Sequence, residues 1–136
     1  MKQGIQTNFP HEKLREYGCY FFVLLRWAEI LRGGSFEFAD TDALRIFDCC
    51  KKFGWVEDDC FVINPVAVLN YCQKQKVFIS VSKSLTGPGE GICAVYLKKP
   101  KHGHFVLSRK GEIWDSLDPG RPGAKDYRVD SYRVII

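Results

Sequence analysis

Apolar residues follow one another almost without a break from Leu14 to Leu31, and they occupy every side of a 3.6-residue period. A helix that is apolar nearly all round is buried in the middle of a domain. The sequence therefore predicts a central buried helix over this range. Gly33-Gly34 ends it, because glycine is favoured just past a helix C-terminus.

Two further helices are indicated by the residues at their ends. One begins with Asp40 or Thr41 as its N-cap and stops at Gly54. The other is predicted over Pro65–Gln75, because Asn64 is a good N-cap and proline is favoured at the first helical position.

The pattern changes to alternation after residue 76, which is typical of strands. Helices first and a mostly antiparallel sheet second define an α+β fold. We expect one domain over residues 1–136, with a helical part at about 11–76 packed on a sheet part at about 77–136. The predicted strands are 77–81, 92–97, 105–108, 112–117 and 127–135, with a turn-rich loop, SLTGPGEG, at 84–91.

Composition narrows the class of protein. At 136 residues, with 46% hydrophobic and 14% aromatic side chains, the chain has enough apolar surface for one core, which excludes disordered and fibrous classes. The formal charge of +4 is spread along the chain, so we expect no nucleic-acid partner. The longest apolar run, Cys19–Leu25, is too short to cross a membrane, so we expect no membrane partner.

The chain has six cysteines, an even number that would suit disulfides in a secreted protein. The N-terminal segment lacks the apolar core of a signal peptide, so we expect free thiols and a cytoplasmic location. Without a C-x-x-C pair or a Gly-Lys-Ser/Thr phosphate loop, the sequence predicts no metal and no other cofactor. The cysteines are Cys19, Cys49, Cys50, Cys60, Cys72 and Cys93.

The segment GHFVLSRKGEIWDSLDPG predicts a β-hairpin, for which two turns are possible. A two-residue turn of Lys110-Gly111 needs a positive φ at Lys110, whereas a three-residue turn that ends in a left-handed glycine does not. The three-residue turn is therefore expected, with Ser108 opposite Glu112 and Val106 opposite Trp114.

Either turn brings a carboxylate to the face of His104. The expected register places Asp118 there, and the other register places Asp115 there. A carboxylate bonded to one ring nitrogen fixes the tautomer and leaves the other nitrogen free to take a proton. A plain surface hairpin with a satisfied histidine is the alternative interpretation.

Cys19 follows Gly18 within the predicted buried helix. If the helix begins at Gly18 or Cys19, the unpaired N–H groups and the positive end of the helix dipole favour a thiolate, which is the nucleophilic form. If it begins at Leu14, this effect is lost, and Cys19 is a small buried apolar residue, as many free cysteines are.

The segments YGCYFF, ICAVYLKKPKHGHFVL and WDSLDPG, in this order, resemble the papain-like cysteine peptidases, most closely the small bacterial ones of the bacteriocin-processing type. The resemblance implies a hydrolase for amide or thioester bonds that acts on a peptide or protein substrate. It implies Cys19 as nucleophile, His104 as general base and Asp118 as the residue that orients the imidazole, with Asp115 as the alternate. The loop 84–91 and the segment 98–102 are expected to border the cleft.

The chain departs from that family's pattern in one respect. Papain-like enzymes usually have a glutamine a few residues before the cysteine, and its amide helps to form the oxyanion hole; here residues 13–18 contain none. Gln6 or Gln3 folding back, Lys13, or the Tyr17 hydroxyl are the possible substitutes. A weak or inactive module that binds a protein partner is therefore the alternative function, and a small host-interaction protein of phage or plasmid origin is a third.

Overall fold

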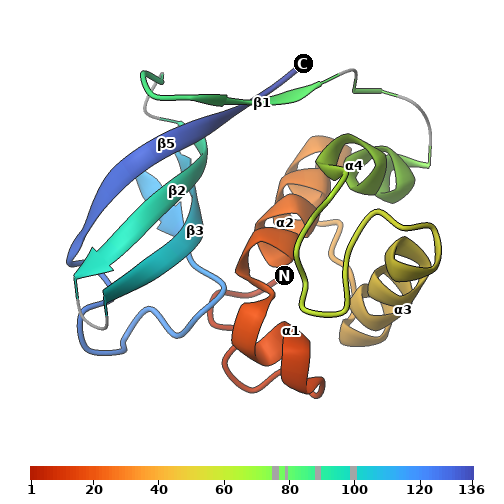
Figure 1. Cartoon of the computed structure of the whole chain (residues 1–136), viewed down its shortest axis with the longest axis horizontal. Coiled ribbons are helices and arrows are strands. Elements are labelled where there is room, and N and C mark those ends of the chain that lie inside the picture. Colours follow the sequence, from red (N-terminus) through yellow and green to blue (C-terminus); the bar gives the residue numbers. More distant parts are fainter. Residues whose placement is uncertain (75–76, 79, 88–89, 99–100) are drawn as a thin grey trace.

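The computed structural model describes residues 1–74, 77–78, 80–87, 90–98 and 101–136. Across these residues four helices come first and one five-stranded antiparallel sheet follows, which confirms the α+β prediction. In Figure 1 the sheet and the helices form two adjacent halves, and the strand order is β1-β5-β2-β3-β4. The elements are α1 (Glu12–Tyr17), α2 (Cys19–Arg32), α3 (Asp40–Lys52), α4 (Pro65–Gln73), β1 (Val81–Ser84), β2 (Gly91–Lys98), β3 (Lys101–Arg109), β4 (Glu112–Trp114) and β5 (Tyr127–Ile135).

The long helix predicted from Leu14 is broken at Gly18, so that α1 and α2 are separate and Cys19 is the first residue of α2. The backbone N–H of Gly18 donates to the carbonyl of Leu14 at 3.0 Å. A Cβ at Gly18 would lie 2.4 Å from that same oxygen, so only glycine fits this close approach. Of the two predicted helix starts, the one at Cys19 is the correct one, and Gly33 ends α2 as expected, with φ of 78°.

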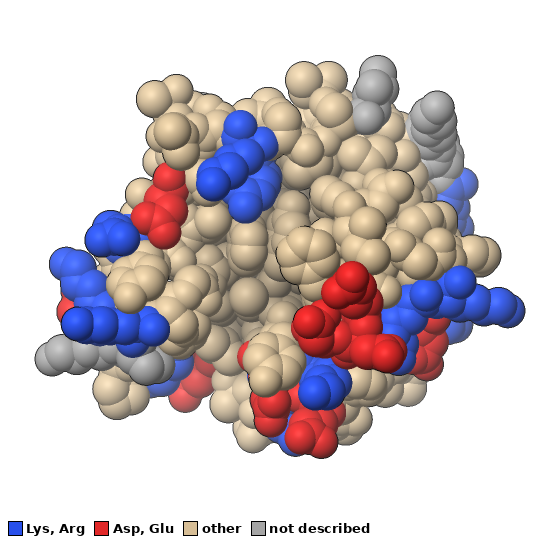
Figure 2. Space-filling model, viewed as in Figure 1, with Lys and Arg blue, Asp and Glu red and all other residues tan. Residues whose placement is uncertain are grey.

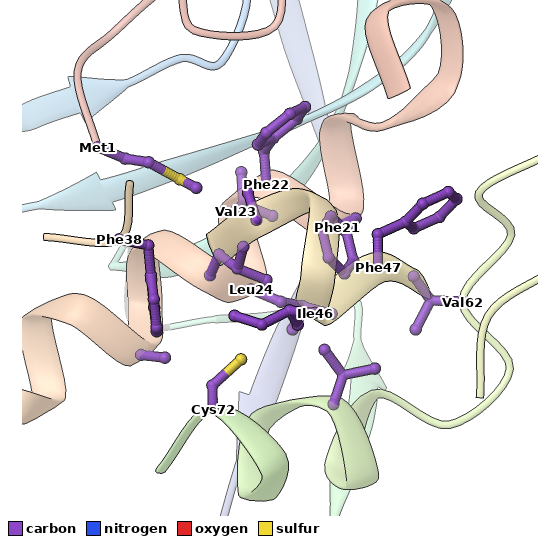
Figure 3. Packing of buried hydrophobic residues seen from close by; sticks show 14 of the residues in the cluster. Met1, Phe21, Phe22, Val23, Leu24, Phe38, Ile46, Phe47, Val62 and Cys72 are labelled. Atoms are coloured by element: carbon purple, nitrogen blue, oxygen red, sulfur yellow. The ribbon is translucent and has the colours of Figure 1, made fainter. Parts of the chain in front are cut away.

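Helix α2 is the centre of the core, as its apolar pattern predicts. It contacts β3 on one side and α4 on the other. Figure 3 shows Phe21, Phe22 and Leu24 of α2 among side chains from α3 and α4. Phe21 and Phe47 pack edge to face with ring centroids 5.4 Å apart, and both are fully buried. Each such ring contributes about 1.5–3 kcal/mol by leaving water.

The chain before α1 joins the two halves. The backbone N–H of Gly4 donates to the carbonyl of Asp115 at 3.0 Å, and that of Gln6 donates to the carbonyl of Ser116 at 2.7 Å. These bonds hold the segment that follows β4 against the segment that precedes α1. The start of α2 and the end of the hairpin are thereby fixed relative to each other.

A buried carboxylate fastens the same N-terminal segment to α2. Both oxygens of Glu29 accept from the Met1 ammonium, at 2.7 and 2.8 Å, and the side chain of Glu29 is fully buried. Glu29 also accepts from the backbone N–H of Phe38 at 2.7 Å and from Arg26 at 3.2 Å. Four hydrogen bonds compensate the cost of burying this charge.

The hairpin has the two-residue turn, so the three-residue prediction is wrong. The register is Arg109 opposite Glu112 and Leu107 opposite Trp114. Lys110 adopts a φ of 51° and Gly111 a φ of 78°, the pair of positive angles that this turn requires. The backbone N–H of Lys110 donates to Glu90 at 2.8 Å, which helps to hold the unfavourable angle.

Other boundaries differ by a few residues. Helix α4 ends at Gln73, because Lys74 adopts a left-handed φ of 60°; Gln75, the predicted end, lies outside the described residues. The strand predicted at 77–81 starts only at Val81, and its Ile79 is also outside. The same holds for residues 88–89 of the predicted loop and residues 99–100 of the segment expected to border the cleft.

Candidate active site

A buried histidine and a buried aspartate pair at the end of the sheet. The Nε2 atom of His104, on β3, lies 2.7 Å from Oδ1 of Asp115, the residue that follows β4. Only 3% of His104 and 4% of Asp115 are exposed. The same carboxylate accepts from the backbone N–H of Leu117 at 3.0 Å and, through Oδ2, from Arg121 at 3.0 Å. Asp115 is therefore held on three sides, and it holds the imidazole in turn.

The third member of the group is Cys19. Its side chain is half-buried at the start of α2, and it hydrogen-bonds the His104 imidazole. Because Asp115 occupies Nε2, the nitrogen left for the thiol is Nδ1. The structure thus brings Cys19 and His104 together, as the resemblance implied, from segments 85 residues apart in the chain.

Electrostatics favour a protonated imidazole at neutral pH. Burial alone would lower the pKa of His104, but the hydrogen bonds to Asp115 and Cys19, and the negative charge of both groups, raise it to about 9. Burial alone would raise the pKa of Asp115, but the hydrogen bond and positive charge of His104, with help from Leu117 and Arg121, lower it. The pair is therefore an ion pair over the physiological range.

Asp118 does not reach the histidine, so the choice of Asp118 over Asp115 as its partner needs correction. Asp118 is exposed, and its Oδ1 accepts from the backbone N–H of Gly120 at 2.9 Å. Its own N–H donates to Thr7 at 2.8 Å. The reason is the hairpin register: the two-residue turn moves β4 by one position and gives the place beside His104 to Asp115.

Of the possible oxyanion donors, Gln6 is the buried one. It is 2% exposed; its Nε2 donates to the carbonyl of Arg15 at 3.1 Å, and its Oε1 accepts from Ser116 at 2.6 Å. The amide thus lies between the last turn of α1 and the residue after Asp115. Gln3 accepts from the backbone N–H of Asp115 at 3.4 Å.

Lys13 and Tyr17 are both exposed on α1, with the Lys13 ammonium 5.6 Å from the Tyr17 ring centroid. Neither side chain is shown to contact Cys19. Of the four residues suggested by the sequence, Gln6 is the one whose side chain bonds a neighbour of Asp115, namely Ser116.

Sequence reasoning missed Arg121, which bridges Oδ2 of Asp115 and the carbonyl of Asp118, the latter at 2.9 Å. The only signal was a basic residue directly after the Asp-Pro-Gly turn. Sequence reasoning also missed Ser116, which orients Gln6.

The described residues contain no group of three or more His, Cys, Asp or Glu side chains placed to hold a metal ion. None of the helices described above has the length and apolar character needed to cross a membrane. All six cysteines are free thiols.

These features define an α+β protein in which a buried imidazole links a cysteine at a helix start to an aspartate at a strand end. The chain belongs to DUF261, a family described as "Protein of unknown function", whose family model matches residues 1–136. No curated protein matches the sequence. No solved structure matches it either.

Proposed function

We propose that this protein is a papain-like cysteine hydrolase that cleaves an amide or thioester bond in a peptide or protein. The observation that carries the proposal is the position of His104, hydrogen-bonded to the Cys19 side chain and, through Nε2, to Asp115. A nucleophile, a base within hydrogen-bond reach and a third group that orients the base are the three parts of such a site.

The reaction would proceed in two steps. The Cys19 thiolate attacks the substrate carbonyl carbon, and the electron pair of the C=O bond moves onto oxygen. When the carbonyl re-forms, the bond to the leaving amine or thiol breaks, and protonated His104 gives its proton to that group. A thioester between Cys19 and the acyl group remains.

In the second step His104 is neutral and takes a proton from water, whose oxygen attacks the thioester carbonyl. The C–S bond breaks, the acid product leaves, and the pair of Cys19 thiolate and protonated His104 is restored. Asp115 stays ionised throughout. Its part is to keep Nε2 protonated and to stabilise the positive ring.

Two N–H donors are suited to the oxyanion. Cys19 is the first residue of α2, so its backbone N–H has no acceptor within the helix. The Gln6 amide nitrogen has two hydrogens, and the bond to the Arg15 carbonyl uses one. We propose that Gln6 replaces the glutamine usually found closer to the cysteine, which weakens the main reason for an inactive binding module.

We propose a cytoplasmic location, because a nucleophilic cysteine and five other free thiols require reducing surroundings. The aspartate in this proposal is Asp115, in place of Asp118.

The first test is the rate of iodoacetamide alkylation at each cysteine against pH, measured by mass spectrometry. Cys49 is the internal control, because it is half-buried like Cys19. Burial raises the pKa of Cys72 to about 12, so this thiol should react slowly. We expect Cys19 to react at least about tenfold faster than Cys49 at pH 6–7, since the protonated His104 imidazole beside it makes the sulfur a better nucleophile.

The variant His104→Gln should abolish this advantage, whereas His102→Gln, on the exposed part of the same strand, should keep it. Hydrolysis is tested separately with p-nitrophenyl acetate, which would acetylate Cys19 and release nitrophenol. Product in excess of enzyme shows that the thioester is hydrolysed. If Cys19 and Cys49 are labelled at equal rates, and His104→Gln does not change the Cys19 rate, the proposal is contradicted. If Cys19 is labelled fast but no ester is turned over, the protein is better described as a binding module.

A further inference from the structure

A cavity of about 500 Å³ lies beside the candidate site, between the helices and the sheet. Its apolar walls come from both halves: Tyr20, Cys60, Val62, Val81 and Phe105. Figure 2 shows that this face of the molecule is hollowed between the sheet on the left and the helices on the right, with basic side chains at the upper edge. A cavity of this size accepts an aromatic or large aliphatic side chain.

The cavity neighbours the reactive group along the chain: neither Cys19 nor His104 lines it, but the residue that follows each of them does. Tyr20 follows Cys19, Phe105 follows His104, and their rings stack with centroids 4.2 Å apart and an interplanar angle of 13°. Cys60 lies in the opposite wall. Burial raises the pKa of the Cys60 thiol, and the charges of Asp59 and Cys19 add to this effect, which places Cys19 near this wall. A substrate whose carbonyl lies at Cys19 would therefore extend a neighbouring group into this space.

Two cations line the sheet side of the cavity. Lys83 of β1 and Arg133 of β5 are directly opposite each other in the antiparallel register. The Arg133 guanidinium lies over the rings of Phe105 and Tyr20, 5.1 and 5.9 Å from their centroids. Its Nη1 atom donates to Ser131 at 2.9 Å. These contacts hold the guanidinium in place before any ligand arrives.

Neither cation has a carboxylate partner in the part of the chain that the structure describes. The single acidic residue of the cavity wall, Asp59, is exposed, and its Oδ1 accepts from the backbone N–H of Phe61 at 3.1 Å. Among the described residues, the cavity wall thus has two cations without a carboxylate partner and one acid. The charge balance on the sheet side favours an anionic ligand group.

We propose that this cavity is the specificity pocket of the enzyme, and that it takes an apolar side chain with a carboxylate beside it. The apolar part packs on Tyr20 and Phe105, and the carboxylate binds Lys83 and Arg133. The inference rests on the proposed function, because it assigns the pocket to the substrate of that site. The substrate class is an acyl compound or peptide with an aromatic or aliphatic residue and a free carboxylate next to the scissile bond.

A matched pair of electrophiles tests the charge. N-chloroacetyl-L-phenylalanine and its amide differ only in the carboxylate, and both alkylate thiols by losing chloride. After division by their rates with free cysteine, we expect the acid to alkylate Cys19 about fivefold faster than the amide, the ratio that about 1 kcal/mol of ion pairing gives. The ratio should fall towards one as salt rises to about 1 M.

N-chloroacetylglycine tests the apolar contact, and we expect it to react about tenfold more slowly than the phenylalanine compound because it has no ring to bury. In Lys83→Gln, a change at an exposed strand position, the acid-to-amide ratio should fall by about half or more. Arg133→Gln should bring the acid-to-amide ratio to one.

The outcomes separate the two hypotheses. Equal normalised rates for acid and amide in the wild-type protein, together with fast His104-dependent iodoacetamide labelling, would overturn the pocket assignment and leave the hydrolase intact. Preference for the acid with slow, His104-independent labelling would keep the pocket as a binding site and overturn the hydrolase. Faster reaction of the amide than of the acid would also overturn the assignment, since it would mean that the negative charge of Asp59 repels the carboxylate more than the two cations attract it.

Discussion

Replacing Asp115 by asparagine removes the charge that faces His104 and keeps the size of the side chain. The folded site raises the pKa of His104 from 6.5 to about 9, which corresponds to about 3 kcal/mol in favour of the protonated ring. Asp115 and Cys19 share this effect, and burial opposes it. Loss of a charge-assisted hydrogen bond in a buried site costs about 1.5 kcal/mol or more, so the pKa of His104 should fall to about 8 or below.

The sign of the stability effect follows from the direction of the shift. A raised pKa means that protonated His104 stabilises the folded state fully below pH 6.5, and that this contribution is lost as pH rises to about 9. Urea denaturation of the wild-type protein across this range should show the loss. In Asp115→Asn the loss should be smaller and should end at lower pH.

Two measurements check this directly. NMR titration of the imidazole reports the pKa of His104. Iodoacetamide labelling of Cys19 at pH 7 should slow about tenfold in Asp115→Asn, the factor that corresponds to about 1.4 kcal/mol less stabilisation of the protonated His104 ring. Asp118→Asn is the matched control, since the Asp118 side chain accepts from the Gly120 N–H of its own turn, and it should stay within about twofold of wild type. Equal effects of the two substitutions, or none at Asp115, would refute the assignment of Asp115 as the partner of His104.

Three further predictions concern the framework of the site. Glu29→Gln should lower the free energy of unfolding by about 3 kcal/mol in urea denaturation, because it removes the buried counter-charge of the Met1 ammonium and leaves only Glu37, 3.5 Å away and 67% exposed; Glu37→Gln should change it by less than about 0.5 kcal/mol. Lys110→Gly should raise the melting temperature, since glycine adopts the positive φ of 51° without strain, for a gain of about 0.5–1 kcal/mol; a decrease would contradict the turn assignment. Gly18→Ala should lower stability by about 1–3 kcal/mol and slow Cys19 alkylation, because its Cβ would push the start of α2 away from Leu14; unchanged labelling and stability would show that the helix break is not needed.

The order of elements was predictable because the apolar pattern of each element is local. The buried α2, the asparagine cap of α4 and the division into a helical and a sheet half all follow from such patterns. The proximity of Cys19 and His104 had no local signal. It came from resemblance to a family, since no spacing rule connects residues so far apart.

The hairpin register was not predictable from the turn residues. The turn that forms has a small conformational cost at Lys110, and contacts with distant parts of the fold outweigh this cost. A left-handed lysine costs about 1–2 kcal/mol, which favours the other turn. In the folded protein the actual register buries Trp114 and pairs Asp115 with His104. These contacts involve the N-terminal segment and the core, so they lie beyond the reach of turn preferences.

The hydrogen bonds from Gly4 to Asp115 and from Gln6 to Ser116 close a loop of about 110 residues. Closing a loop of this length costs about 4 kcal/mol of chain entropy, so contacts at its ends form late in folding. On the ribosome, Asp115 emerges about 5 to 20 seconds after Cys19. A stalled chain that ends before residue 115 should therefore label at Cys19 no faster than at Cys49. Under the proposed function, Cys19 gains its reactivity only when the last part of the fold closes around it, so an incomplete chain is not yet able to cleave itself or its neighbours.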